Sequence, residues 1–193
     1  MPTFNQELEK FLASKKQKTL QELIDIFADK SFAVLFLLLL ALPALPLPTG
    51  GVTHIFEIIA MQLAFELIIG RKTVWLPKRW LNKTTPASLQ SSVLPKFLKI
   101  INWFEKFSRP RLNKIQNNTI YPRVIGIVIL LFVVFAFLAP PFSGLDTLPS
   151  LGVVILSLGL IFKDILLSVI GFIIGSVGIL LIFILGNLIF QLF

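Results

Sequence analysis

Two long stretches without any charged residue constrain this chain more than any other feature. Residues 165–193 are 29 consecutive uncharged residues, and residues 124–142 are 19 more. A helix of about 20 apolar residues crosses the hydrocarbon core of a bilayer, so runs of this length are typical of membrane spans. Only 15% of all residues are charged, against about a quarter in soluble domains. The sequence therefore predicts an all-α integral membrane protein, and it excludes a soluble enzyme or a nucleic-acid-binding domain.

The charged residues outside these stretches divide the chain. Residues 1–31 hold five lysines and five acidic residues, whereas residues 71–123 hold twelve Lys or Arg and one acid. Basic residues in loops next to membrane spans are retained on the cytoplasmic side. We therefore expect both segments to be cytoplasmic, in a multi-pass membrane protein. The segment between them, residues 32–70, must then enter the membrane and return.

Prolines and glycines predict that the membrane segments form two broken hairpins. In the first, residues 32–70, an apolar arm is followed by a break and then by a helix that resumes at residue 52. In the second, residues 124–164, a pair of prolines ends the first arm, and a shorter arm covers residues 151–162. Proline removes a helix hydrogen-bond donor, and glycine lets the chain reverse. The residues of these breaks are Pro43, Pro46, Pro48, Gly50 and Gly51 in the first hairpin and Pro140, Pro141 and Pro149 in the second.

The two hairpins resemble each other in sequence. A shift of 101 residues aligns Leu47-Pro48-Thr49 with Leu148-Pro149-Ser150, and it also aligns Gly70 with Gly171. Paired interrupted segments point to a transporter-like binding site, although any two membrane hairpins share Pro, Gly and Leu by composition. We predict an internal repeat, and we expect the first hairpin either just to span the membrane or to be re-entrant.

The two charged segments carry amphipathic patterns. In residues 1–31, apolar residues recur at helical spacing from Phe4 to Leu12, and in residues 71–123 a similar pattern follows Pro95. Helices of this kind lie in the membrane interface, where their lysines meet anionic headgroups, or they pack onto the hairpins of their own chain. Anionic membrane lipids are therefore the first predicted partner.

Small residues share one face of the C-terminal transmembrane helix that is predicted over residues 165–193. They are Ser168, Gly171, Gly175 and Gly178. Small residues let two helices approach to backbone contact, so we predict a homodimer joined through this face. The competing interpretation is that the face receives the first hairpin of the same chain.

Polar side chains within and directly after the first hairpin are the candidate substrate- or ion-binding residues. They are His54, Glu57, Gln62, Glu66, Arg71 and Lys72. Ionisable groups inside a membrane are costly, which makes them candidates for function. Glu57 is the candidate for binding a proton or a cation, with His54 on the same helix face three residues earlier. The alternatives are that His54 lies in headgroup water and that Glu66 simply pairs with Arg71 or Lys72.

The sequence carries no catalytic pattern. The chain has one histidine and no cysteine, and it lacks the HExxH, GxSxG and P-loop patterns. We therefore expect a protein that is not an enzyme and that holds no metal ion or other cofactor.

Several short stretches occur in an order that is typical of one family. They are Thr19-Leu-Gln-Glu-Leu-Ile-Asp, Ala-Leu-Pro43-Ala-Leu-Pro46-Leu-Pro48, Gln62, Gly70-Arg71-Lys72-Thr-Val-Trp75-Leu76-Pro77 and Arg109-Pro110-Arg111. Together they resemble the ExoD family, which comprises bacterial membrane proteins named for exopolysaccharide synthesis. The resemblance implies that process without a mechanism. Two classes of function fit: a transporter or translocase for an ion or a lipid-linked anionic intermediate, and a non-transporting scaffold or regulator that binds polysaccharide synthesis proteins.

Overall fold

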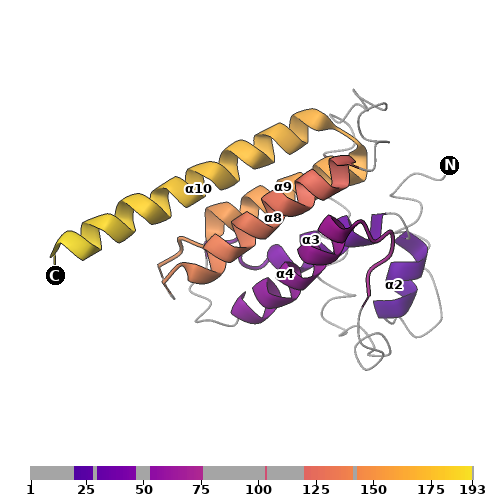
Figure 1. The fold of residues 1–193 in the computed structure, drawn as a ribbon, viewed down its shortest axis with the longest axis horizontal. Coiled ribbons are helices and arrows are strands. Elements are labelled where there is room, and N and C mark those ends of the chain that lie inside the picture. The colour runs from indigo at the N-terminus through magenta and orange to yellow at the C-terminus, as the bar shows by residue number, and fades with distance from the viewer. Residues whose placement is uncertain are drawn as a thin grey trace.

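The computed structural model describes residues 20–27, 30–46, 53–75, 103, 120–140 and 143–192. The helices in these ranges are α2 (Leu20–Phe27), α3 (Ser31–Leu40), α4 (Thr53–Ile69), α8 (Ile120–Leu138), α9 (Thr147–Phe162) and α10 (Ile165–Leu192). The same ranges contain no β-strand, which confirms the all-α prediction. Figure 1 shows α10 continuing past the other helices towards the C-terminus.

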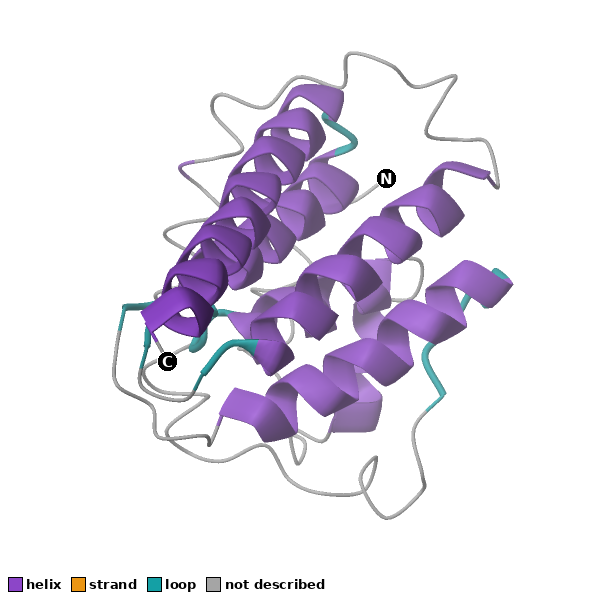
Figure 2. Cartoon of the chain, turned by 60° about the vertical axis from the view of Figure 1, so that its left-hand side comes forward, coloured by secondary structure: helices purple, strands orange, loops and turns teal. Residues whose placement is uncertain are grey.

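Four of the helices form a closed ring around the core. α3 packs against α4 and α9, and α8 packs against the same two helices, so α4 and α9 lie diagonally opposite each other. Figure 2 shows the described helices packed alongside one another as one bundle. α10 lies outside this ring and packs mainly on α9. Neighbours α4 and α8 run antiparallel, because His54 contacts Phe137 at one end while Ile68 lies against Gly126 at the other.

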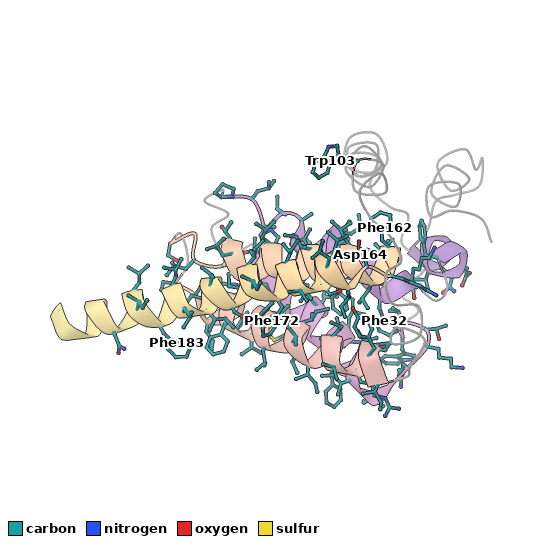
Figure 3. All side chains as sticks on the ribbon, turned by 90° about the horizontal axis from the view of Figure 1, so that it is seen from above. Phe32, Trp103, Phe162, Asp164, Phe172 and Phe183 are labelled. Atoms are coloured by element: carbon teal, nitrogen blue, oxygen red, sulfur yellow. The ribbon has the colours of Figure 1, made fainter. Side chains whose placement is uncertain are left out.

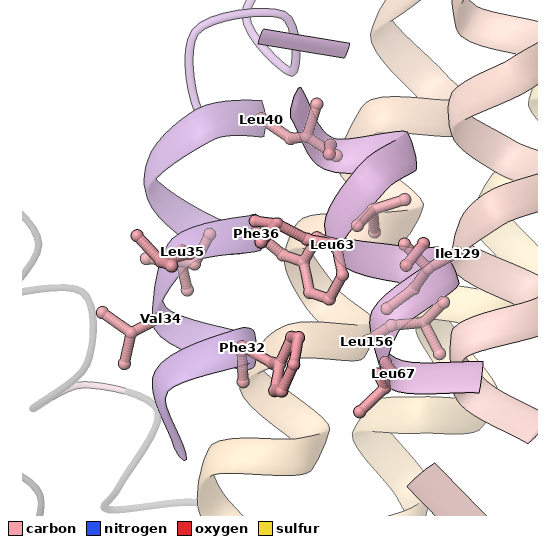
Figure 4. Packing of buried hydrophobic residues seen from close by; sticks show 14 of the residues in the cluster. Phe32, Val34, Leu35, Phe36, Leu40, Leu63, Leu67, Ile129 and Leu156 are labelled. Carbon is pink, nitrogen blue, oxygen red and sulfur yellow. The ribbon is translucent and has the colours of Figure 1, made fainter. Parts of the chain in front are cut away.

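The bundle therefore has two distinct ends. At the tip end, α3 and α8 finish and α4 and α9 begin. At the basic end, α3 and α8 begin and α4 and α9 finish. Figure 4 shows this polarity in the first hairpin, where Phe32 and Leu67 lie at one end and Leu40 at the other. A 2.7 Å hydrogen bond between the hydroxyl groups of Tyr121 and Ser168 places the α9–α10 turn at the basic end.

Large apolar side chains fill the ring. Phe36 and Leu40 of α3, Leu63 of α4, Ile129 of α8 and Leu156 of α9 are fully buried (Figure 4). α3 is apolar around its whole circumference, and helices of that kind are buried on all sides. Its ten residues make it about 15 Å long, roughly half of the hydrocarbon thickness of a bilayer. The first arm is therefore a short and mostly buried member of the ring.

The outer surface of the bundle is apolar. Ile127 and Leu131 of α8 and Phe172 and Phe183 of α10 are about half exposed, the last two at the surface seen in Figure 3. Extended exposed apolar surface marks contact with a membrane or a partner. Among the described helices, two are long and apolar enough to cross a membrane, Ile120–Leu138 and Ile165–Asn187. The second of these is the predicted C-terminal span.

The second hairpin differs from its prediction in where the helices begin. α8 begins at Ile120 and α9 at Thr147, each four residues before the predicted apolar arm. Pro149, which was predicted to belong to the break, is instead the third residue of α9. The first turn of a helix accepts proline, because its N–H groups have no partner within the helix.

The first hairpin also continues past its first proline. The Ala44 N–H donates to the Leu40 carbonyl at 2.9 Å, so the helical path extends one turn beyond α3 and includes the buried Pro43. Pro46 is exposed beyond this turn, and Pro140 is the second residue after the end of α8. The other predicted break residues lie outside the described residues: Pro48, Gly50, Gly51 and Pro141.

The small-residue face of α10 has a different occupant from the two that were predicted. Its four residues are all buried: Ser168, Gly171, Gly175 and Gly178. α9 lies in this groove, with Gly152 against Gly171 and Gly175 and with Pro149 against Gly178. The contact is therefore neither with a second copy nor with the first hairpin. The homodimer itself stays a prediction, and this face is not available to it.

The helix boundaries do not coincide under the shift of 101 residues. α4 falls on residues 154–170, which the turn at Lys163–Asp164 divides between α9 and α10. The internal repeat therefore stays a prediction from sequence.

Of the predicted N-terminal helical segment, α2 is described and packs against α3 through the buried Ile24 and Phe27. The pattern from Phe4 to Leu12 and the pattern after Pro95, apart from Trp103, lie outside the described residues.

Candidate functional site

Glu57 is the most enclosed charged side chain in the described part of the chain. It lies in the second turn of α4, and its side chain is fully buried. His54, one turn earlier on the same face, places Nδ1 2.7 Å from Glu57 Oε2 and is itself 27% exposed. A spacing of three residues makes this contact a local consequence of the helix. The predicted pair is present, and it reaches from the surface of the bundle into its interior.

One oxygen of Glu57 has no partner. Glu57 Oε1 is buried without a hydrogen bond, and so is Ser150 Oγ in the first turn of α9. Leaving a buried polar atom unpaired costs roughly 1–3 kcal/mol, so each such atom in a native fold requires an explanation. Both atoms belong to helices that begin at the tip end. A third such atom among the described residues, Ser31 Oγ, lies at the opposite end, where α3 begins, so two of the three unpaired buried atoms lie near the tip end.

The second hairpin supplies two neighbours of this pair that the sequence analysis did not assign to the site. The His54 ring lies edge-on against Phe137 of α8, with 5.0 Å between the ring centroids. Asp146, directly before α9, interacts electrostatically with both His54 and Glu57. Burial raises the pKa of the Asp146 carboxyl above its ordinary value. The only local sequence signal for Asp146 was an acidic residue beside a helix start. We name the three ionisable groups, His54, Glu57 and Asp146, the tip cluster.

A second buried carboxylate of α4, Glu66, has a different role at the basic end. Its Oε2 accepts a 2.8 Å hydrogen bond from the backbone N–H of Trp75, and its Oε1 accepts a 3.2 Å hydrogen bond from Gln62 Nε2. These bonds hold the segment after α4 back against the helix. They replace the ion pair with Arg71 or Lys72 that the sequence offered as an alternative.

The six candidate residues thus form two groups at opposite ends of α4. Glu57 and Glu66 are nine residues apart, which is about 13 Å along a helix axis. His54 and Glu57 belong to the tip end. The remaining candidates belong to the basic end: Gln62, Glu66, Arg71 and Lys72.

Basic side chains gather at one end of the bundle. Within the described ranges every Lys and Arg is found at the basic end: Lys30, Arg71, Lys72, Arg123 and Lys163. The Arg71 guanidinium lies 5.9 Å from the centre of the Trp75 ring, and Arg123 packs against Gly70. At the tip end the described ionisable groups are those of the tip cluster alone. Fold and charge together therefore give the bundle a polarity along its long axis.

In the described part of the chain, the fold and the site define a class of protein: an all-helical bundle with two helices long and apolar enough to cross a membrane, and a His–Glu pair that reaches into the bundle at the end where α4 begins. The sequence model of the family described as "Exopolysaccharide synthesis, ExoD" matches residues 4–184. The chain belongs to the ExoD family. Membership confirms the resemblance seen in the sequence, and it implies a role in exopolysaccharide synthesis.

Two relatives show how far the similarity extends. An uncharacterized protein of Synechocystis sp. is 24% identical over 163 residues, which cover 83% of this chain and 76% of the relative. Protein ExoD of Rhizobium meliloti is 28% identical over 149 residues, which cover 76% of this chain but only 61% of that protein. No solved structure matches this chain.

Proposed function

We propose that this protein is a small transporter of the membrane stage of exopolysaccharide synthesis, with Glu57 as its ion-coupling carboxylate. The observation that carries the proposal is the full burial of Glu57 beside His54, with one carboxylate oxygen left unpaired. Ionisable residues within membrane helices mark ion and proton pathways in pumps and transporters. In this proposal the protein is not an enzyme and needs no cofactor.

The position of the tip cluster supports coupling between the two hairpins. Glu57 and His54 come from the first hairpin, whereas Phe137 and Asp146 come from the second. A change in the charge of Glu57 changes its interaction with Asp146 directly. Ion binding at Glu57 therefore acts on the contact between the hairpins, which is the contact that a transport cycle has to rearrange.

The charge polarity supports an orientation and a cargo. Loops rich in Lys and Arg stay on the cytoplasmic side, so the basic end faces the cytoplasm in the proposed multi-pass topology of the bacterial inner membrane. Arg71 and Lys72 are exposed there, next to the anionic lipid headgroups that attract them. Two exposed cations suit a lipid-linked anionic intermediate of the polysaccharide as the cargo.

The test compares Glu57→Gln with Glu66→Gln, a matched change at the second buried carboxylate of α4. Each variant is expressed in a strain that lacks the native gene, and both exopolysaccharide output and protein content of the membrane are measured. Purified protein is then reconstituted in liposomes with radiolabelled lipid-linked saccharides extracted from that strain. We expect Glu57→Gln to lose output and flux while remaining in the membrane. Glu66→Gln should retain both, because a glutamine carbonyl still accepts from Trp75.

Full exopolysaccharide output with Glu57→Gln would contradict the proposal. If the wild-type protein produces no flux but binds an enzyme of polysaccharide synthesis, the alternative function holds instead, and the protein is a non-transporting scaffold or regulator of assembly.

A further inference from the structure

We infer that the ion taken up at Glu57 is a proton and that it enters through His54 from the tip end, on the side of the membrane opposite the cytoplasm. The inference rests on the proposed function and names the coupling ion, its route and its direction of access. The observations that carry it are the exposure of the members of the tip cluster, the hydrogen bond between two of them and the polarity of the bundle.

Exposure differs between the members of the tip cluster, because two of them are partly exposed and Glu57 is not. Asp146 is partly exposed in the turn before α9, the His54 side chain is 27% exposed, and the Glu57 side chain is not exposed at all. Only His54 among these groups touches Glu57 directly, at 2.7 Å. Water on the tip side therefore meets the imidazole first, and the imidazole meets the buried carboxylate. Contact with Phe137 holds the ring in this position.

The chemistry of imidazole matches this position. When Glu57 is ionised, neutral His54 donates its Nδ1–H to Oε2. A proton from water binds Nε2 and forms the imidazolium, and the Nδ1 proton then moves to Oε2. The products are a neutral carboxylic acid and a neutral imidazole that carries its proton on Nε2. One proton enters, no charge is left on the ring, and the two ring nitrogens act as entry and exit.

The donor set favours a proton over a metal ion. A metal ion needs several ligands at once, and the described residues contain no group of three or more His, Asp or Glu side chains able to hold one. A proton needs a single acceptor, which Glu57 supplies.

Of the helices packed around α4, α3 contributes no titratable residue, and Arg123 and Tyr121 of α8 lie at the basic end. Asp146 is therefore the described charge that acts on the pair from outside α4.

A first test uses the fact that His54 is the single histidine of the chain. Protein labelled with ¹⁵N-histidine gives signals from this ring alone, and its two nitrogens report protonation and tautomer in the reconstituted wild-type protein. We expect the ring signals to show two titration steps, one of which disappears in Glu57→Gln. Glu66→Gln is the matched control and should keep both steps. Identical titrations of the wild type and Glu57→Gln would overturn the inference, because the two groups would then not exchange a proton.

A second test measures the route and the side. The carboxyl stretch of Glu57 is followed by infrared spectroscopy on ¹³C-glutamate-labelled protein, with the band assigned by its loss in Glu57→Gln. Vesicles of each orientation, identified by labelling Lys163→Cys with an impermeant reagent, are exposed to a sudden external pH change. We expect a prompt response only when the tip end faces outward, slowed roughly 10²-fold in His54→Gln. A prompt response from the basic end, or an unchanged rate in His54→Gln, would overturn the inference.

These readouts are independent of cargo transport. If Glu57 exchanges its proton through His54 but the liposomes show no flux, the proposed function fails and the proton route stands. If flux requires Glu57 while neither spectroscopic readout depends on His54, the route fails and the transporter stands.

Discussion

Adding one methyl group at Gly152 tests the contact between α9 and α10. A Cβ at this position would lie 2.6 Å from Gly175 Cα, 2.8 Å from Gly175 N and 2.9 Å from the Gly171 carbonyl oxygen. Ordinary contacts begin at 3.4 Å, and all three atoms belong to a helix backbone, so no side chain can rotate out of the way. Gly152→Ala therefore forces the two helices apart along the face where they pack most closely.

The expected cost follows from this geometry. Overpacking of a well-packed core costs typically about 1–3 kcal/mol, and a clash with backbone belongs in the upper part of that range. The higher helix propensity of alanine offsets up to about 1 kcal/mol. We expect Gly152→Ala to lower the free energy of unfolding by roughly 1–2 kcal/mol, measured by reversible denaturation in mixed detergent micelles.

Gly186→Ala is the matched control on the same helix pair. A Cβ at Gly186 meets nothing within 4 Å, so this variant should be at least as stable as the wild type. Equal stability of Gly152→Ala and the wild type would refute the packing of α9 into the small-residue face. If Gly152→Ala loses the mass of a dimer while its monomer remains as stable as the wild type, the small-residue face contacts a second copy instead.

Three further changes test individual contacts. Glu66→Ala leaves the Trp75 N–H without its acceptor and should lower the free energy of unfolding by about 1–3 kcal/mol in the same assay. Gln62→Ala should lower it by less. The reverse order would contradict the role of Glu66 as the acceptor that holds Trp75. Gly70 has φ +88° and Gly144 has φ +69°, so Gly70→Ala and Gly144→Ala should each lower the free energy of unfolding by about 1–2 kcal/mol in the same assay. The flexible end of the Arg123 side chain, 2.7 Å from a Cβ at residue 70, can move aside. Stability equal to the wild type in either variant would contradict the positive φ. Burial raises the folded-state pKa of Asp146, so the protonated form is favoured in the folded protein. That stabilisation is complete below the ordinary pKa of 3.8 and is lost as pH rises through the raised value. As pH rises over this range, the melting temperature of the wild type should therefore fall more than that of Asp146→Asn. Parallel curves of melting temperature against pH for the two proteins would contradict this prediction.

Local spacing and composition were sufficient to predict the helices and their contacts within one turn. The uncharged runs predicted α8 and α10, because a span of apolar residues has few other stable environments. The His54–Glu57 contact follows from a spacing of three residues on one helix. The distribution of Lys and Arg already separated a basic side from a side without basic residues. Proline was less informative, since Pro43 and Pro149 occupy helical turns that the sequence placed in breaks.

Contacts between helices were decided by packing of the whole chain. The small face of α10 has the same sequence whether it receives a second copy, the first hairpin or α9; α9 occupies it because a short turn at Lys163–Asp164 brings Gly152 opposite Gly175. Likewise, no local pattern relates Asp146 to Glu57, because their interaction depends on α4 and α9 beginning at the same end of the ring. Spacing along a helix is a property of the backbone, whereas the choice of neighbour depends on how all the helix surfaces fit together.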